Sequence, residues 1–256
     1  MTLALVLVAA PARPALADTW ARGLARRADV VLDESLSRGA RRHADAIAAA
    51  DRPPDDVGPA LAAEGLADAQ VLTFAAIGTK DALAQRADAF AAGPARALEP
   101  THVGVGRARG PGTEVLVVVW SRRLAELPPL PRTLPQRPFR WVSTLLAGAR
   151  PRLFVTLPTG EVRELEAHTE GRRVWAELPF EDARGAYDVE LLVETTRGPE
   201  LAALWRAAVG IPARGPALIA PLSDARAVAS AVDELRRGAG RTPLRADPDL
   251  ERAARA

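Results

Sequence analysis

The sequence predicts an α+β chain, in which helices and strands come first, a small all-β region follows, and a helical segment comes last. Three observations lead to this prediction. Apolar residues recur every three or four positions from Asp18 to about Ala50, which is typical of amphipathic helices. Short alternating segments separated by turn residues fill residues 139–212. Another amphipathic helical pattern begins near Asp224.

The composition allows ordinary hydrophobic cores. Of the 256 residues, 48% are hydrophobic, and 34 basic and 32 acidic residues leave a formal net charge of +2. A chain of this length commonly forms two domains. Basic and acidic residues alternate along the predicted helices and do not cluster beside aromatic residues, so we expect no nucleic-acid binding. The absence of cysteine neither favours nor excludes export, because a domain with a sufficient core needs no disulfide.

The first residues are similar to a secretory signal. The apolar run Leu3–Ala10 is too short to span a bilayer, and "ALA" at Ala15–Ala17 offers a cleavage site before Asp18. We therefore expect a signal peptide at 1–17 and a secreted, periplasmic or cell-envelope protein. A buried first strand is the alternative. No other segment approaches the length of a transmembrane helix.

The elements after Ala50 alternate between helix and strand. The turn-rich "DRPPDDVGP" precedes a short helix, residues 60–64, that ends at Gly65. "AQVLTFAAIG" predicts a strand, and the next helix has Thr79 as a candidate N-cap. "THVGVGRARGPGTEVLVVVWSRR" predicts a hairpin, because two apolar runs flank the turn signal "GPG".

The segment "ELPPLPRTLPQRP", residues 126–138, has too many prolines for a helix or a sheet and predicts an extended linker. Five short segments then indicate a small immunoglobulin-like sandwich, although a Cys–Trp–Cys signature is missing. In the clearest of them, apolar residues alternate with polar ones, as in a half-buried strand: Tyr187, Val189, Leu191 and Val193. "PELAALWRAAVG" fits a helix or a strand.

After a second Pro- and Gly-rich break, "DARAVASAVDELRRGAGR" predicts an amphipathic helix. Ser223 or Asp224 is the candidate cap, and Gly238 and Gly240 are the candidate ends. The residues that follow repeat a pattern from near the start of the chain. At one constant spacing, Asp33, Leu36, Arg38, Ala40 and Arg41 match Asp247, Leu250, Arg252, Ala254 and Arg255.

These repeated stretches resemble the opening element of the CAP superfamily, the cysteine-rich secretory, antigen 5 and pathogenesis-related 1 proteins, in its cysteine-free bacterial form. The stretches are "VVLDESLSRGARRHADAI", residues 30–47, and "VDELRRGAGRTPLRADPDLERAARA", residues 232–256. The predicted hairpin resembles the closing hairpin of the same family. The resemblance implies an α–β–α sandwich in a degenerate first copy and the incomplete helical start of a second CAP domain.

The six predicted regions follow from these observations. They are a signal peptide (1–17), a degenerate CAP-like domain (18–125), a Pro-rich linker (126–138), a β-sandwich domain (139–212), a second linker (213–221) and the amino-terminal fragment of a second CAP domain (222–256).

The resemblance also implies what the first copy lacks. CAP cavities often carry two His and two Glu that can hold a divalent metal, and these are ligands that zinc accepts. Leu72 or Thr73 stands where the family has the acid of "GEN", and Ala95 stands where it has the His of "SPGHR". The "F.H" loop is missing after Ala50. We therefore expect no catalytic residue, metal or cofactor in residues 18–125.

The histidines and the remaining polar motifs have structural interpretations. His43 is expected to be partly buried on a helix face, and His168 to be solvated. His102 is expected to lie at the surface at a strand end, with a place in the lining of the former cavity as the alternative. Ser121 has no flanking elbow glycines, and "GVGRARG" follows no strand-to-helix transition, so neither a nucleophile nor a phosphate loop is expected. The acidic residues near His168 predict a solvated face and no calcium site: Glu161, Glu164, Glu166 and Glu170.

Together these observations favour a secreted, non-catalytic binding or structural module. CAP domains bind sterols, lipids or proteins in different members, so the partner is an unidentified protein, lipid or cell-envelope ligand. One alternative is a metal-dependent hydrolase whose active CAP copy lies beyond the end of this chain. A second is an intracellular α/β chain without export.

Overall fold

The computed structural model describes residues 17–50, 56–110 and 113–213, together with a few positions nearer the carboxyl end. It divides the chain into two compact units, Met1–Ala213 and Arg214–Ala256. The predicted signal peptide (except Ala17), the second linker from 214 onward and nearly all of 222–256 lie outside the described residues. The positions described within the predicted helix are helical: Ser230, Val232, Asp233, Arg236 and Arg237.

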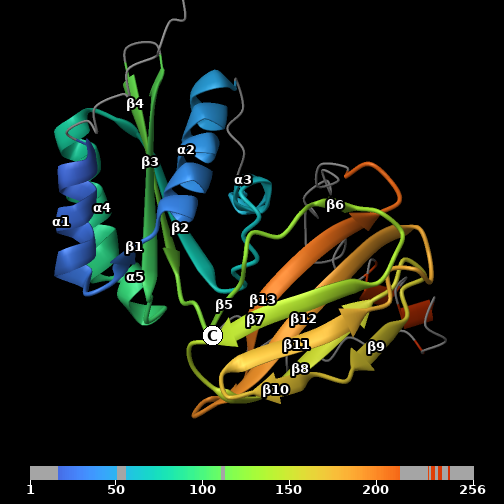
Figure 1. Cartoon of the computed structure of the whole chain (residues 1–256). Coiled ribbons are helices and arrows are strands. Elements are labelled where there is room, and N and C mark those ends of the chain that lie inside the picture. The colour runs from blue at the N-terminus through green and yellow to red at the C-terminus, as the bar shows by residue number, and fades with distance from the viewer. Residues whose placement is uncertain are drawn as a thin grey trace, which may run out of the picture. The chain divides into compact units, whose positions relative to one another are not determined.

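The first half of the larger unit is built of helices around one sheet (Figure 1). Its elements are α1 (Ala17–Ala28), β1 (Val31–Leu32), α2 (Glu34–Ala49), α3 (Gly58–Ala63), β2 (Val71–Gly78), α4 (Lys80–Ala92), α5 (Pro94–Ala97), β3 (His102–Gly110) and β4 (Thr113–Ser121). The sheet order is β1-β3-β4-β2, with β1 parallel to β3 and the other pairs antiparallel. The predicted strand and hairpin are confirmed, and helices and strands together confirm the α+β class.

The helical stretch predicted from Asp18 to Ala50 is wrong in one respect, because it is two helices with a short strand between them. Asp29 has a φ of 53° and ends the first helix. The N–H groups of Val31 and Asp33 then donate to the carbonyls of Thr101 and Val103, so the chain pairs with β3 and does not continue the helix. Asp33 caps α2 by accepting a hydrogen bond from the Leu36 N–H.

Helices cover both faces of this sheet, as Figure 1 shows, with α1 and α4 on one side and α2 on the other. β4 explains why both faces need a cover, because its apolar run has no polar face. Val115, Val117 and Val119 belong to the core under α2 and α3, whereas Leu116, Val118 and Trp120 belong to the core under α1, α4 and α5. A strand that is buried on both faces reads as one continuous apolar run.

The glycines of β3 allow α2 to lie directly against the sheet. A Cβ on Gly104 would come 2.3 Å from the carbonyl carbon of Leu36, and one on Gly106 would come 2.1 Å from that of Ala40. No side chain fits at such distances, so the helix and strand backbones touch. The motif "GVGRARG" is therefore a packing feature within a strand, in agreement with the prediction that it is no phosphate loop.

The second half of the larger unit consists of two packed sheets. Its strands are β5 (Ala125–Glu126), β6 (Thr133–Leu134), β7 (Phe139–Leu145), β8 (Ala149–Thr156), β9 (Val162–Leu165), β10 (His168–Glu170), β11 (Arg173–Leu178), β12 (Gly185–Thr195) and β13 (Gly198–Val209). One sheet has the order β10-β11-β7-β5 and the other β6-β13-β12-β8-β9. Trp141 from the first sheet and Trp205 from the second meet in a shared core, with ring centroids 5.8 Å apart.

Several predictions about this half can be compared with the structure. Tyr187, Val189, Leu191 and Val193 are buried and alternate with more exposed residues, as expected. "PELAALWRAAVG" is a strand, since it forms most of β13. β7 is an additional strand that the five predicted segments do not contain. The Pro-rich segment is extended, as predicted, but β6 within it pairs with β13, and Leu130 is buried in the core.

Among the residues that the structure describes, no helix is long and apolar enough to cross a membrane.

Candidate functional site

The positions at which the CAP resemblance places metal ligands hold apolar or hydroxyl side chains inside the fold. Leu72 and Thr73 lie in β2 opposite Trp120 and Val119 of β4, and both are half-buried. Ala95 is fully buried in α5. Within the described ranges, no three His, Asp or Glu side chains are grouped so that they could hold a metal ion. These positions therefore offer an apolar or weakly polar environment to any ligand.

A cavity of about 470 Å³ opens between α1, the α4–α5 corner and the sheet. The last turn of α1 forms one wall, the last turn of α4 forms the opposite wall, and Trp120 of β4 forms the floor. The lining residues are Leu24, Arg27, Ala28, Asp29, Asp88, Ala91, Ala92, Arg96, Pro100 and Trp120. Its size lies within the range of small-molecule sites in proteins.

The charged groups of this cavity differ in how they are paired. Arg27 Nη2 lies 2.6 Å from Asp88 Oδ1, so this ion pair ties α1 to α4 across the cavity. The exposed Arg96 makes no ion pair with the other described residues. The Trp120 indole N–H is buried and has no hydrogen-bond partner within the described part of the chain. The cavity thus combines an apolar floor with one guanidinium that is available to a ligand.

A second group of polar side chains lies where β4 leads into the two-sheet half. Arg123 is central to it, with a side chain that is only 10% exposed. Its Nε and Nη2 bind the two carboxylate oxygens of Asp68 at 2.7 and 3.1 Å, and its Nη1 binds Asp33 Oδ2 at 2.9 Å. The Ser121 hydroxyl donates to Asp68 Oδ1 at 2.8 Å. Ser121 is thus part of an ion-pair network.

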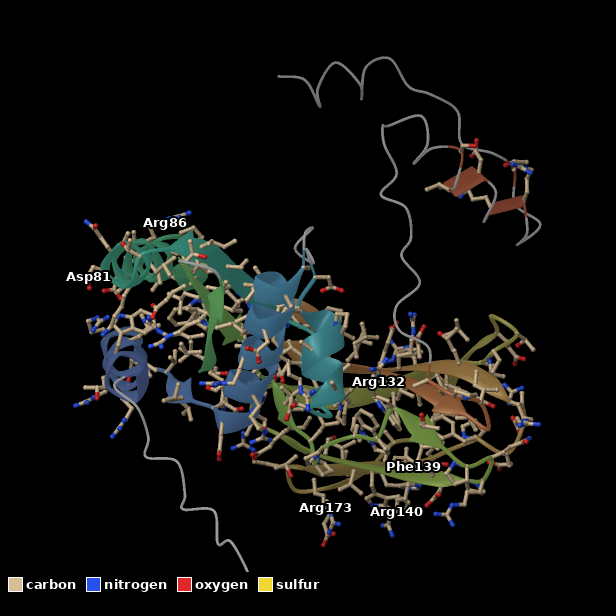
Figure 2. The ribbon with its side chains drawn as sticks, turned by 90° about the horizontal axis from the view of Figure 1, so that it is seen from above. Asp81, Arg86, Arg132, Phe139, Arg140 and Arg173 are labelled. Carbon is tan, nitrogen blue, oxygen red and sulfur yellow. The ribbon has the colours of Figure 1, made fainter. Side chains whose placement is uncertain are left out.

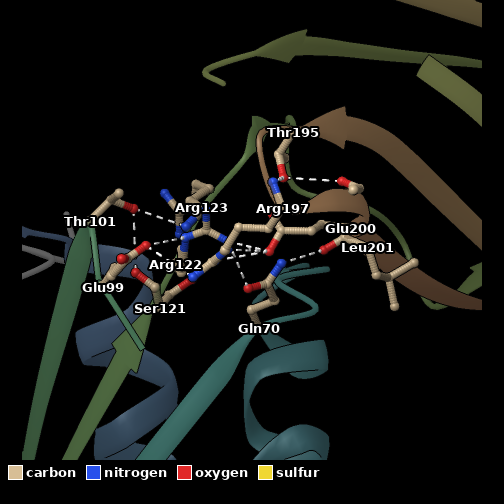
Figure 3. A network of polar contacts seen from close by, with 11 residues as sticks. Gln70, Glu99, Thr101, Ser121, Arg122, Arg123, Thr195, Arg197, Glu200 and Leu201 are labelled. Atoms are coloured by element: carbon tan, nitrogen blue, oxygen red, sulfur yellow. Dashed lines mark hydrogen bonds and ion pairs between the residues drawn. The ribbon is translucent and has the colours of Figure 1, made fainter. Parts of the chain in front are cut away.

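Arg122 begins a neighbouring set of contacts on the more exposed side (Figure 3). Its Nη1 lies 2.8 Å from Glu200 Oε1, and Arg197 Nη2 lies 2.8 Å from the same oxygen. Arg197 also reaches Glu99 Oε2 at 3.1 Å, and the Gln70 side chain donates to the carbonyl of Leu201 at 3.1 Å. Side chains from both halves of the larger unit therefore meet in one network.

The carboxylates of these networks titrate below their ordinary range. Burial on its own would raise the pKa of Glu200, but hydrogen bonds from Thr195, Arg122 and Arg197 outweigh it and lower the pKa to about 2. Burial likewise opposes ionisation of Asp33, yet the Leu36 N–H and the Arg123 guanidinium hold its pKa below the usual value. Both groups are therefore charged at neutral pH.

His43 and His168 lie as the sequence predicts, whereas His102 opens a strand as predicted but is half-buried. His43 is buried on α2, and its burial lowers its pKa although the Asp56 carboxylate opposes that shift. His102 opens β3, with Nδ1 2.8 Å from the Thr101 hydroxyl oxygen, and burial followed by the charge of Arg123 lowers its pKa. His168 is exposed and stacks on Trp175, with ring centroids 4.0 Å apart.

The remaining polar residues of interest lie on the outer face of the β10-β11-β7-β5 sheet and in or near β9 of the other sheet. Arg140 and Arg173 project from this face (Figure 2), and the Arg140 guanidinium lies 4.5 Å from the Trp175 ring centroid. His168 stacks on the same ring. Of the predicted acidic face, all four residues are exposed, and two of them form ion pairs with arginine: Glu161 with Arg163, and Glu164 with Arg152.

Sequence reasoning missed both the cavity and Arg123 with its two partners. Arg122 and Arg123 come shortly after the apolar run Val115–Val119, with Trp120 and Ser121 between, and two charges after a buried strand were a usable signal. Asp68 gave no comparable signal, because its partner is 55 positions away. Arg27 and Arg96 are two among many arginines, so the sequence alone does not distinguish them as cavity residues.

Comparison with known proteins adds little. No family model matches the chain, and no curated protein matches it. Four chains among the solved structures match. One is the crystal structure of an engineered protein, with a TM-score of 0.28 and 16% sequence identity, over 51% of this chain and 28% of that chain. This chain therefore spans about 28% of the length of that engineered protein. A likeness at this level carries no argument about fold or function.

Proposed function

We propose that this chain is a secreted CAP-superfamily protein that acts as a non-catalytic binding module. Its ligand site is the cavity between α1, α4 and α5, and the two-sheet half is an immunoglobulin-like companion. The proposed ligand is a small organic molecule with an apolar body and an anionic group. The observation that carries the proposal is the cavity itself, with its Trp120 floor and with Arg96 at its edge, which forms no ion pair within the part of the chain that the structure describes.

The arrangement of the first half supports the CAP part of this proposal. The resemblance implies an α–β–α sandwich, and helices do lie on both faces of the β1-β3-β4-β2 sheet. The β3–β4 hairpin closes this half, in the place where the family has its closing hairpin. Asp33 and Leu36 are two of the residues that recur near the carboxyl end, as Asp247 and Leu250. Asp33 caps a helix by accepting from the Leu36 N–H, which gives this pair a structural role.

The strand order supports an immunoglobulin-like companion. In that fold, strands A, B, E and D form one sheet and C, F and G form the other. The orders β10-β11-β7-β5 and β13-β12-β8 correspond if β7 is strand B and β12 is strand F. At the start of β12 the Tyr187 hydroxyl donates to the Ala183 carbonyl at 2.8 Å and accepts from its N–H at 3.0 Å. This contact matches the tyrosine corner of such domains.

The chemistry of the cavity supports an anionic, partly apolar ligand. A guanidinium binds carboxylate or phosphate oxygens in bidentate fashion, and Arg96 is not occupied by a carboxylate of the described chain. The walls from Leu24, Ala28 and Ala91 can bury an apolar group. Leu72, Thr73 and Ala95 offer no imidazole or carboxylate to a metal at the family positions, which supports binding without metal-dependent catalysis.

The fluorescent anion 1-anilinonaphthalene-8-sulfonate tests this proposal. We expect saturable binding of one probe per chain, detected as a rise in probe fluorescence. Ala92→Trp, which fills the cavity mouth, is expected to abolish the saturable signal. Arg96→Gln is expected to weaken it at least fivefold because the charge is lost. Circular dichroism establishes that each variant is folded.

Arg86→Gln is the matched control, because Arg86 lies on α4 outside the cavity lining and is exposed (Figure 2). It is expected to bind the probe as the wild type does. Equal weakening by Arg86→Gln and Arg96→Gln, or unchanged binding in Ala92→Trp, would show that the probe binds elsewhere and would reject the cavity as the ligand site.

A further inference from the structure

The segment between α3 and β2, residues 65–70, belongs to both halves of the larger unit. Its backbone runs along the edge of β13, where the Leu204 N–H donates to the Ala67 carbonyl at 2.9 Å and Asp68 forms an antiparallel bridge with Ala203. Ala67 is buried in the core of the two-sheet half. The segment thus extends a sheet of the second half before its chain enters the sheet of the first.

The connection from β4 to β5 makes the reverse crossing a short distance away. Leu124 and Ala125 are buried in the core of the two-sheet half, and they follow directly on Arg123. Each crossing therefore places a buried apolar residue next to a buried charge: Ala67 next to Asp68, and Leu124 next to Arg123. The bidentate ion pair between Asp68 and Arg123 joins the two crossings.

Further contacts lie next to the two crossings and join the same two halves. The Leu130 N–H donates to the Gly65 carbonyl at 2.9 Å. Gly65 has a φ of 76°, and a Cβ there would lie 2.8 Å from the Leu130 nitrogen, so only glycine fits. Arg122 reaches Glu200 of β13 at 2.8 Å. The Arg197–Glu99 pair contributes less, because Glu99 is 66% exposed and such pairs are weak in water.

We infer that residues 65–70 and Arg122–Arg123 couple the two halves, so that residues 17–213 unfold as one cooperative unit. The sequence divides this region into a domain, a linker and a second domain. If the two-sheet half unfolded alone, Ala67, Leu124 and Ala125 would lose their core, and the Asp68–Arg123 pair would lose its shelter from water. The remaining half would expose these apolar residues to water and keep an ion pair that water weakens. Intermediates with one half folded are therefore unfavourable.

Equilibrium pulse labelling tests the inference on the full chain. The protein is equilibrated at a series of urea concentrations, exposed briefly to deuterated water, and weighed by mass spectrometry both intact and after digestion with pepsin. We expect no more than two mass populations at any concentration, one protected and one exchanged, with both present through the unfolding transition. A third population, in which peptides of β4 are protected while those of β12 are exchanged, or the reverse, would overturn the inference.

Asp68→Asn assigns the coupling to the ion pair, because it removes the charge and keeps the shape of the side chain. We expect the third population to appear in this variant at intermediate urea. Glu164→Gln is the matched control, because it removes the carboxylate of the bidentate Arg152–Glu164 pair inside the second half. It should show two populations only.

If Asp68→Asn does not fold, Arg122→Ala replaces it, because Arg122 contacts Glu200 across the same place. Two populations in the folded variant would reject the role of the contact that was removed. The wild-type distribution decides the coupling without either variant, and no outcome depends on whether the cavity binds a ligand.

Discussion

Single carboxylates near the meeting point of the two halves show how neighbouring arginines can outweigh burial. Glu200 has little access to water, which favours its neutral form, yet two guanidinium groups and a threonine hydroxyl stabilise the charged form more strongly. Such a group links folding to pH, since its pKa differs between the folded and unfolded chain.

Glu200→Gln tests this link. The folded pKa is about 2 and the ordinary value is 4.5, so the carboxylate stabilises the fold fully above about pH 4.5. That stabilisation is lost as the pH falls through about 2. We therefore expect the variant to unfold at lower urea than the wild type at pH 7, and the difference to shrink between pH 4.5 and pH 2. Urea unfolding followed by circular dichroism measures it. A difference that does not change with pH would contradict the pKa assignment.

Residue patterns in the sequence identified the burial of His43 and the exposure of His168 without identifying their partners. His43 lies on a helix face whose spacing indicates burial, so local pattern was enough. Arg123 and Asp68 could not be paired in this way, because only the folded chain brings residues from separate connections together.

At the scale of elements, α2 and β3 depend on each other through glycine. Two glycines two positions apart place no side chain between the strand and the helix, so the backbones approach directly. The sequence shows the glycines but not the helix that needs them. It also shows β-branched residues at Val30 and Val31, and these, with Asp33 as a cap, explain the helix break that periodicity alone overlooked.

Gly106→Ala tests this dependence. The new Cβ would lie 2.1 Å from backbone atoms of Ala40 and Arg41, which cannot rotate away, so α2 must move off the sheet. We expect a loss of more than about 3 kcal/mol in the free energy of unfolding. Gly23→Ala in α1 is the control, because its Cβ would meet only the flexible end of Arg27. It should change stability by less than about 1 kcal/mol. Equal effects would contradict the packing argument.

For the whole molecule, the sequence predicted the class and most elements because their periodicities are local. The alternation of Tyr187 to Val193 and the apolar run of β4 both specify their strands directly. The sequence did not predict that the Pro-rich segment adds strand β6 to a sheet and the buried Leu130 to the core of the two-sheet half. Prolines exclude regular ladders locally, but an edge strand of two residues needs few backbone donors.

The cavity was beyond prediction for the same reason. Its walls come from α1, α4, α5, β4 and the connections that contain Asp29 and Pro100, and none of these segments carries a motif for ligand binding. The proposal that the chain binds a ligand without a catalytic metal therefore depends on how these elements assemble and on the side chains at Leu72, Thr73 and Ala95.

Calorimetric titration of zinc chloride into the full chain tests that proposal most directly, because the family that the first half resembles often holds a divalent metal in its cavity. At micromolar protein and neutral pH, we expect no saturable heat that corresponds to one zinc ion per chain. Binding of one zinc per chain that is lost in His102→Ala or His43→Ala would contradict the account and would indicate a metal centre in the first half.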